Sequence, residues 1–303
     1  MTMDLDTLLD RRRLKRRLTF WRIAAIVAVA ALVIFVAGRF NTFGSGDHIA
    51  ILDVENIIID DSDRNEALER IAGDSSVKAL LVHINSPGGT VVGGEALYLA
   101  LRKVAKNKPV VAVMADLATS AGYMTAIAAD QIFARRSTVT GSIGVIMQTT
   151  DITGLLEKIG VKPESIKSAP LKAQPNPLEP MSEKARAAAQ AVVSDMFAMF
   201  VDMVTERRKM DRETVTKLSD GRVYTGRQAL ENGLIDALGG EKEALDWLAS
   251  AKNISRKLPK RAVRIRRDDS FLRKTLEDLF GKTLISERLR LDGLISLWHP
   301  NLQ

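Results

Sequence analysis

Cysteine is absent from this sequence of 303 residues, and histidine is limited to His48, His83 and His299. The absence of cysteine excludes a thiol nucleophile and cysteine-based metal sites. Three scattered histidines form no metal cluster and leave few candidates for a serine–histidine pair. His83 lies within an apolar run, where a lone histidine is expected to pack in the core. We therefore predict neither a metal ion nor another cofactor, and nucleophilic chemistry must depend on other side chains.

Charge is distributed unevenly along the chain, whose formal net charge is +7. Residues 1–22 carry seven basic and three acidic side chains, and residues 252–303 carry thirteen basic and six acidic ones, so residues 23–251 have a net charge of −4. A nucleic-acid-binding domain needs a basic folded face. We therefore expect no nucleic-acid partner, and the basic ends fit a lipid bilayer surface better.

One long apolar run follows the basic N-terminal segment. Residues 23–38 are uncharged, and residues 18–21 and 40–43 can extend the run, with aromatic side chains at both ends. About 20 apolar residues cross a bilayer core. We predict a basic cytoplasmic segment at 1–22 and one transmembrane anchor at 23–43, with the N-terminus in the cytoplasm by the positive-inside rule. A cleaved signal peptide is the alternative, although the small residues after the run form only a weak cleavage site.

Strand-like and helix-like segments alternate from His48 onward. Apolar, β-branched runs predict strands, and helical periodicity predicts the segments between them. The expected strands are 49–59, 77–84, 110–114, 132–134 and 143–147, and the expected helices include 65–72 and 91–104. This alternation is typical of an α/β fold with a mostly parallel sheet. Ligands of such sheets bind at the carboxyl ends of the strands.

Two loops fall at those ends. The first, Asn85-Ser86-Pro87-Gly88-Gly89-Thr90, offers two glycines that allow positive φ and bring N–H groups close to a ligand. An oxyanion hole needs such donors, whereas a phosphate loop would need the Lys-Ser/Thr that is missing here. The second loop, within residues 117–130, places Ser120 at a strand-to-helix turn, which suits a nucleophile. An ordinary turn and a simple helix N-cap are the alternatives.

A nucleophilic serine needs a base, and lysine remains once histidine is set aside. A serine–lysine pair is a recognised variant of the catalytic triad. The lysine must be neutral to accept a proton, so burial must lower its pKa by about three units, at a cost of roughly 4 kcal/mol. Lys167 and Lys172 lie in the same candidate segment, residues 165–173, and composition does not choose between them.

A series of motifs follows in order along the chain. They are Asn85-Ser86-Pro87-Gly88-Gly89, Thr119-Ser120-Ala121-Gly122-Tyr123, Ala129-Asp130, Thr140-Gly141-Ser142-Ile143-Gly144-Val145, Ile166-Lys167-Ser168, Gly221-Arg222-Val223-Tyr224-Thr225-Gly226, Gly233-Leu234-Ile235-Asp236 and Gly239-Gly240. This series resembles the signal peptide peptidase A family of membrane-bound serine peptidases. The match covers about residues 48–250 and has the length of the short, single-domain form, because no internal repeat is present.

This resemblance implies a role for five residues in a peptidase domain at 48–250. Ser120 would be the nucleophile, Lys172 the general base and Ser142 the residue that orients the lysine. Gly89 and Ala121 would donate the two oxyanion N–H groups. Alanine stands at 121 where the family usually has glycine, and a positive φ there would be strained. The family's Ser-Gly-x-x-Lys-Asp pattern reads Ser168-Ala169-Pro170-Leu171-Lys172-Ala173 here.

The resemblance also implies a fold, a location and partners. The fold would be a superhelical βα unit of the crotonase/Clp-protease type, preceded by the N-terminal transmembrane helix. The protein would be an endopeptidase of the bacterial inner membrane that cleaves signal-peptide remnants and other apolar peptides, with its catalytic domain on the outer, periplasmic side. Its protomers would form rings with active sites near the protomer interfaces, and serine and lysine would come either from one protomer or from two neighbours. The predicted helix 182–208, which has an apolar face, is either an oligomer contact or a core helix.

The last segment, residues 251–303, lies outside the resemblance. Residues 256–267 include seven basic side chains in twelve, typical of a solvated tail, and residues 271–298 show roughly helical apolar spacing. Two alternatives to the peptidase remain. A crotonase-type acyl-CoA enzyme would use the same N–H donors but has little use for an anchor. A non-enzymatic membrane scaffold of the same fold is favoured only by the altered lysine neighbourhood.

Overall fold

The computed structural model describes residues 17–32, 46–265 and 294–297, and it divides into two units, Met1–Gly46 and Asp47–Gln303. In the first unit, residues 17–32 form a helix whose large apolar side chains, including Phe20, Trp21 and Ile26, are exposed. Residues 23–32 of the expected anchor are thus helical, and residues 33–43 lie outside the described residues. The transmembrane anchor remains a prediction.

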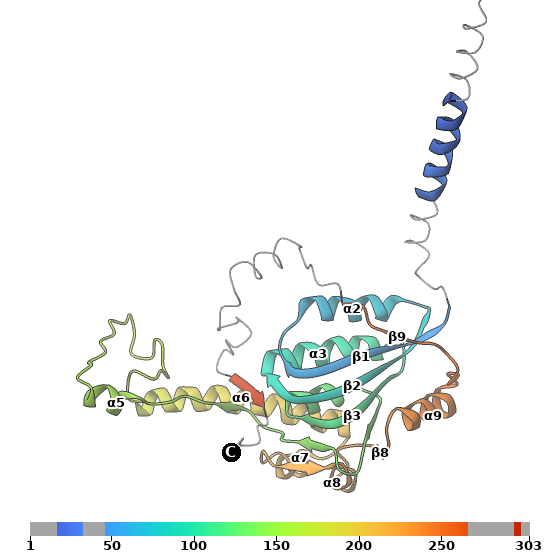
Figure 1. Ribbon diagram of the computed structural model, residues 1–303. Helices are drawn as coiled ribbons and strands as arrows, with labels where there is room; N and C mark the ends of the chain where they lie inside the picture. The colour runs from blue at the N-terminus through green and yellow to red at the C-terminus, as the bar shows by residue number, and fades with distance from the viewer. Residues whose placement is uncertain (1–16, 33–45, 266–293, 298–303) are drawn as a thin grey trace, which may run out of the picture. The chain divides into compact units, whose positions relative to one another are not determined.

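The second unit is built on a mixed sheet, as the alternating pattern predicts (Figure 1). Its centre is parallel: β1 (His48–Ile58) pairs with β2 (Val77–Thr90), β2 with β3 (Val110–Thr119), and β3 with β4 (Gln131–Ala134). The connecting helices are α2 (Ser62–Gly73), α3 (Val91–Ala105) and α4 (Ala121–Ala126). The α/β class is confirmed, and the superhelical Clp-protease-like form stays a prediction.

β2 and β3 continue beyond their expected ends. The glycine segment, expected to be a loop, is paired strand up to Thr90, because Gly88 and Gly89 lie opposite Ile57 and Ile58 of β1. The end of β3 turns to pair with β5 (Val139–Gly141). A continuous strand at 143–147 was the wrong expectation, since only β6 (Ile146–Met147) is extended there.

Two apolar clusters hold the helices to opposite faces of the sheet. Successive β2 residues alternate between them, as a strand buried on both faces requires: Leu80 and Val82 belong to the larger cluster and Leu81 to the smaller. The larger cluster includes side chains of α2, α3, α4 and α6 (Glu183–Arg208), and the smaller one includes Ala244 and Leu248 of α9 (Glu241–Lys252).

Seven further elements complete the described part of this unit. They are α5 (Thr153–Lys158), α7 (Arg212–Leu218), β7 (Val223–Thr225), α8 (Gly226–Glu231), β8 (Ala237–Leu238) and β9 (Lys260–Ala262), followed by β10 (Leu294–Leu297). β9 pairs in parallel with β1, so this part of the basic segment joins the sheet and is not a solvated tail. The expected helical spacing at 271–298 fails at β10, which is a strand, and its other residues lie outside the described ones.

The long helix α6 is a core helix in its C-terminal half, and an oligomer contact by its N-terminal half stays a prediction. Its C-terminal half packs in the core through Phe200, Val201 and Val204, while Val192 in its N-terminal half is exposed. Among the described residues, α6 is the helix long and apolar enough to cross a membrane by length and composition. The packing of its second half against the core identifies that half as a core element of the domain.

Candidate active site

Ser120 occupies a strained turn between β3 and α4. Its φ of 56° and ψ of −118° lie outside the regions that L-residues favour, at a cost of about 1–3 kcal/mol. The Ser120 N–H donates to Gly141 O at 2.8 Å, and its carbonyl accepts from Met124 N at 2.9 Å. The side chain makes no capping hydrogen bond, so the simple N-cap alternative is wrong. Strained strand-to-helix turns of this kind present nucleophilic serines in other hydrolases.

Ala121 is compatible with this turn because the positive φ falls on Ser120. Ala121 begins α4 and is fully buried. Its backbone N–H is among the first of the helix, which have no partner within the helix. The backbone conformation at position 121 therefore does not require the glycine that the family usually has there.

The glycine segment is tied to the nucleophile turn through hydrogen bonds. Thr119 Oγ1 donates to Pro87 O at 3.0 Å, and Gly88 N donates to the buried Ser86 Oγ at 3.1 Å. Gly88 has a φ of 114°, as expected, whereas Gly89 does not adopt positive φ. Gly89 is needed for a different reason: a Cβ there would stand 1.8 Å from Ile58 O. Close approach of β1 thus selects glycine at 89.

Ser142 directly follows β5, whose last residue is hydrogen-bonded to Ser120. Gly141, whose carbonyl accepts the Ser120 N–H, directly precedes it. Ser142 also has a positive φ, 49°, and its N–H donates to Arg222 O at 2.8 Å. The chain from β7 therefore fixes this second serine in a strained conformation next to the first.

The two candidate lysines lie together on a separate segment, residues 148–181, which we call the arm. It contains α5 and projects along the N-terminal half of α6, away from the sheet (Figure 1). Lys167 Nζ pairs with Glu179 Oε2 at 2.5 Å, and this hydrogen bond lowers the pKa of Glu179. Lys172 is exposed, and within the described part of the chain its ammonium group has no hydrogen bond or ion pair.

The structure therefore brings together four of the five expected site residues. Ser120, Ala121 and Ser142 lie on connected turns at the carboxyl ends of the strands, Gly89 lies in the last part of β2, and Lys172 lies on the arm. No hydrogen bond or ion pair between described residues joins the arm to those turns. A single chain leaves the serine buried, with 1% of its surface exposed, and the lysine in solvent.

Two arginines that sequence reasoning missed hold the far end of α4. Arg207 of α6 donates from Nε to Ile127 O at 2.8 Å and from Nη2 to Ala129 O at 2.9 Å. Arg102 of α3 donates to Ala128 O at 2.9 Å. Burial lowers the pKa of Arg207. These residues come from distant helices, so no local pattern in the sequence points to them.

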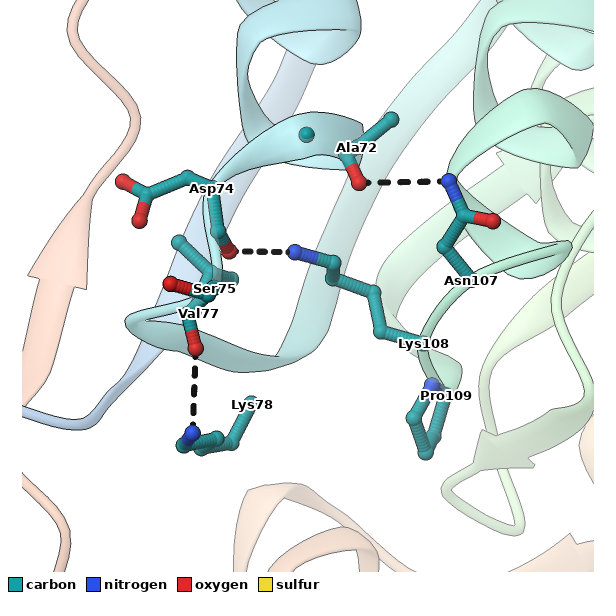
Figure 2. A pocket seen from close by; sticks show the side chains of 9 residues that line it. Ala72, Asp74, Ser75, Val77, Lys78, Asn107, Lys108 and Pro109 are labelled. Carbon is teal, nitrogen blue, oxygen red and sulfur yellow. Dashed lines mark hydrogen bonds between the residues drawn. The ribbon is translucent and has the colours of Figure 1, made fainter.

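A hollow at the amino ends of the strands, opposite the turns around Ser120, has a structural role. It lies between the end of α2 and the start of β3 (Figure 2). Lys108 Nζ donates to Ile71 O and Asp74 O, each at 2.6 Å, and Asn107 Nδ2 donates to Ala72 O at 3.2 Å. These donors satisfy carbonyls at the C-terminus of α2, a common role of lysine there.

His83 is a half-buried bridge, and not the core residue that the apolar run predicts. Its Nδ1 lies 3.1 Å from Asp53 Oδ1, and its Nε2 lies 3.2 Å from Glu241 Oε2. It links α9 to the sheet and takes no part in the turns around Ser120. Within the described ranges, no group of histidines and carboxylates is arranged to hold a metal ion.

Comparison with known proteins identifies relatives that match half of this chain or more. The model of peptidase family S49 matches residues 102–255. An Enterococcus faecium protein provisionally named signal peptide peptidase SppA is 38% identical over 189 residues, which cover 62% of this chain and 55% of that protein. The chloroplastic serine protease SPPA of Arabidopsis thaliana is 31% identical over 275 residues, covering 89% of this chain and 38% of that protein.

Protease 4 of Haemophilus influenzae is 31% identical over 218 residues, covering 69% of this chain and 35% of that protein. A solved structure of a mutant 1510-N membrane-bound stomatin-specific protease aligns with a TM-score of 0.48 at 14% identity, over 72% of this chain and 98% of that one. The chain spans about half the length of the first curated relative that it matches.

Proposed function

The chain belongs to the signal peptide peptidase A family, peptidase family S49; on that basis we propose that it is a membrane-anchored serine endopeptidase with a Ser120–Lys172 dyad. The observation that carries the proposal is the strained turn at Ser120, set between the glycine segment and Ser142. Its substrates are cleaved signal peptides and other apolar peptides.

The reaction follows from this arrangement. Neutral Lys172 takes the proton of Ser120 Oγ as that oxygen attacks the peptide carbonyl carbon, and the N–H groups of Gly89 and Ala121 stabilise the oxyanion. The protonated lysine then gives its proton to the leaving amine. In the second step Lys172 takes a proton from water as the water oxygen attacks the acyl carbon. The bond to Ser120 Oγ then breaks, and the lysine returns the proton to that oxygen. The Ser142 hydroxyl orients the lysine amine.

In the proposed mechanism, assembly with a second copy supplies the buried lysine that Ser120 lacks in a single chain. A lysine in solvent is protonated at neutral pH and cannot act as a base. Burial of a lysine side chain disfavours its charged form, and contact with a second copy would remove Lys172 from solvent. The arm is suited to such a contact, because its large apolar side chains are exposed, Ile166 by 99%. We therefore propose a ring-shaped homo-oligomer in which the arm of one protomer brings Lys172 to Ser120 of the next.

Lys167 is the weaker candidate for the base. Its ammonium group is already paired within the arm, with Glu179 Oε2 at 2.5 Å. Gln174 donates to the same carboxylate oxygen at 2.6 Å, so this group of side chains organises the arm. We assign Lys167 a structural role.

The proposed cellular location of the protein follows from the residues that precede the peptidase domain. The exposed apolar helix at 17–32 is compatible with a single-pass anchor in the bacterial inner membrane, and the basic residues before it favour a cytoplasmic N-terminus. The peptidase domain then lies on the periplasmic side, where cleaved signal peptides can reach it from the bilayer.

Cleavage of a fluorogenic apolar peptide by the detergent-solubilised full chain tests the proposal. Ser120→Ala and Lys172→Ala should each lose at least about 10³-fold in kcat, as removal of a dyad member does in serine peptidases. Lys167→Ala is the matched control and should keep most of its activity. Unchanged cleavage by Ser120→Ala would exclude this serine as the nucleophile, and inactivity of all four proteins would favour the scaffold alternative.

A further inference from the structure

The amino ends of the central strands form one face of the domain, and Asp47, the residue before β1, lies on it. The parallel strands β1, β2, β3 and β9 all begin there, because parallel strands place their first residues at one edge of a sheet. Backbone hydrogen bonds join the segments before these strands, for example from His48 N to Ser76 O at 2.9 Å and from Ile49 N to Pro259 O at 3.0 Å. We call the surface made by residues 46–48, 73–78, 105–110 and 252–260 the basal face.

The chain enters the basal face directly from the predicted anchor. The anchor is predicted at residues 23–43, and the domain begins at Asp47. Four steps of fully extended chain reach at most about 14 Å. In an anchored protein Asp47 therefore stays close to the bilayer surface, and the charge of the basal face decides which lipids it meets.

The basal face is basic, whereas the opposite edge of the central strands is acidic. The four segments of the basal face carry seven basic and two acidic side chains. The carboxyl ends of β1, β2 and β3, at residues 55–61, 85–90 and 115–120, carry four acidic side chains and no basic one. An anionic bilayer attracts basic side chains within about a Debye length of its surface. It would therefore turn this domain with the basal face inward.

Four basic side chains of the basal face already have partners within the domain. Lys78 pairs with Asp47 at 3.1 Å. Arg256 and Lys260 pair with carboxylates of α9. Lys108 is held by carbonyls at the end of α2 (Figure 2). These contacts fix the segments of the basal face to the sheet and leave its other basic groups to interact outside the domain.

Three lysines of the basal face are exposed and have no such partner. To the described residues, their ammonium groups make no ion pair or hydrogen bond. One of them stands over an aromatic ring, with Lys252 Nζ 5.4 Å from the centre of the Trp247 ring, and tryptophan is enriched at membrane interfaces. The three lysines are Lys106, Lys252 and Lys257.

We propose that the basal face docks on anionic phospholipid headgroups through Lys106, Lys252 and Lys257, and so orients the domain on the bilayer. The proposal rests on the anchor of the proposed function and adds the face that meets the bilayer and the lipid class that it recognises. Lysine ammonium groups bind phosphate as point charges. The short chain between anchor and domain holds them at a high effective concentration beside the headgroups, so weak contacts suffice.

This orientation sets a distance between the bilayer and the nucleophile. Residues 77–86 of β2 advance about 3.3 Å each, so the turns around Ser120 stand up to about 30 Å from the basal face. An extended peptide needs about ten residues to span that distance. A substrate with one end in the bilayer must therefore expose about ten residues before it reaches Ser120.

Quenching by labelled lipids tests the orientation in the full chain. Because the sequence has no cysteine, one substitution, Ser75→Cys on the basal face or Asp116→Cys at the opposite edge, takes a single fluorescent label. Each protein is reconstituted in phosphatidylcholine vesicles, with or without phosphatidylglycerol, that contain a phospholipid with a nitroxide on its headgroup. We expect phosphatidylglycerol to increase quenching of the Ser75→Cys label at least about twofold and to leave the Asp116→Cys label unchanged.

Charge variants identify the lysines that cause the increase. Replacing all three lysines of the proposal by glutamine should abolish it, and replacing them by arginine should preserve it. Raised salt should reverse the increase in the protein with intact lysines, since salt screens exposed charges. The matched control removes the same charge from exposed lysines of the arm and of the start of α6, and it should leave quenching unchanged. Its substitutions are Lys158→Gln, Lys162→Gln and Lys184→Gln.

The docking proposal and the proposed function fail in different ways. Equal quenching of the two labels in anionic vesicles, or an increase that persists in the glutamine variant, would overturn the docking of the basal face. A full chain that does not float with the vesicles would overturn the anchor, and this inference with it. Peptidase activity does not enter the measurement, so loss of the proposed dyad would leave the docking proposal standing.

Discussion

Substituting Gly89 by alanine should displace β1 from the end of β2. The added methyl would stand 1.8 Å from Ile58 O, 2.5 Å from Ile58 C and 2.6 Å from Ile58 N, all of them backbone atoms. Because no side chain can rotate away, the strands must separate near Ile57 and Ile58. Overpacking costs about 1–3 kcal/mol, and each lost backbone hydrogen bond adds about 1 kcal/mol. We expect the free energy of unfolding to fall by about 3–4 kcal/mol.

Urea unfolding followed by circular dichroism measures this change. Gly73→Ala is the matched control, because nothing lies within 4 Å of a Cβ at that position, and its unfolding midpoint should stay unchanged or rise slightly. Displacing the Gly89 N–H should also reduce kcat by about 10²–10³-fold below the unfolding transition, as loss of an oxyanion donor does. A Gly89→Ala protein as stable as wild type would refute the close approach of β1.

Two other predictions concern α4. The Tyr123 hydroxyl is buried and donates to Leu234 O at 2.9 Å, and burial raises its pKa. Unfolded tyrosine ionises near pH 10, so this contribution is complete below pH 10 and is lost by up to about 1.4 kcal/mol per pH unit above it. Tyr123→Phe should flatten the fall in unfolding free energy between pH 10 and 11.5, and an unchanged slope would contradict the assignment. Arg207→Met keeps the packing of the stem but removes both carbonyl contacts of Arg207 at the end of α4; it should lower kcat by about 10–100-fold with little change in KM. Arg207→Lys should recover part of the loss, and a change confined to KM would exclude a positioning role.

The local sequence was sufficient to predict the helices and strands whose burial pattern is simple. Periodicity predicted β1, the first part of β2 and α3 close to their observed bounds, because apolar side chains on fixed faces specify them. The glycine segment was predicted as a loop because glycine and proline disfavour strands locally. Its pairing depends on β1, which approaches Gly89 closely only in the folded domain.

The candidate site likewise has some features that local sequence predicts and others that depend on distant parts of the chain. The motif around Ser120 predicted a strand-to-helix turn, and a helix cap was an equally local alternative. Strain at Ser120 arises from its pairing with Gly141, far along the chain, and could not be seen in the sequence. The contacts of Arg207 and the pairing of β10 are likewise non-local. The place of Lys172 in the proposed dyad depends on a second chain.

Complementation between two inactive variants tests the central claim most directly. Ser120→Ala and Lys172→Ala chains are co-expressed with different tags, and assemblies containing both are purified and assayed with the fluorogenic peptide. If the arm of one protomer serves the next, random mixing places an intact serine and an intact lysine at about a quarter of the interfaces, as a head-to-tail ring requires. We predict about a quarter of wild-type activity. A mixture as inactive as each variant alone would contradict a dyad shared between protomers.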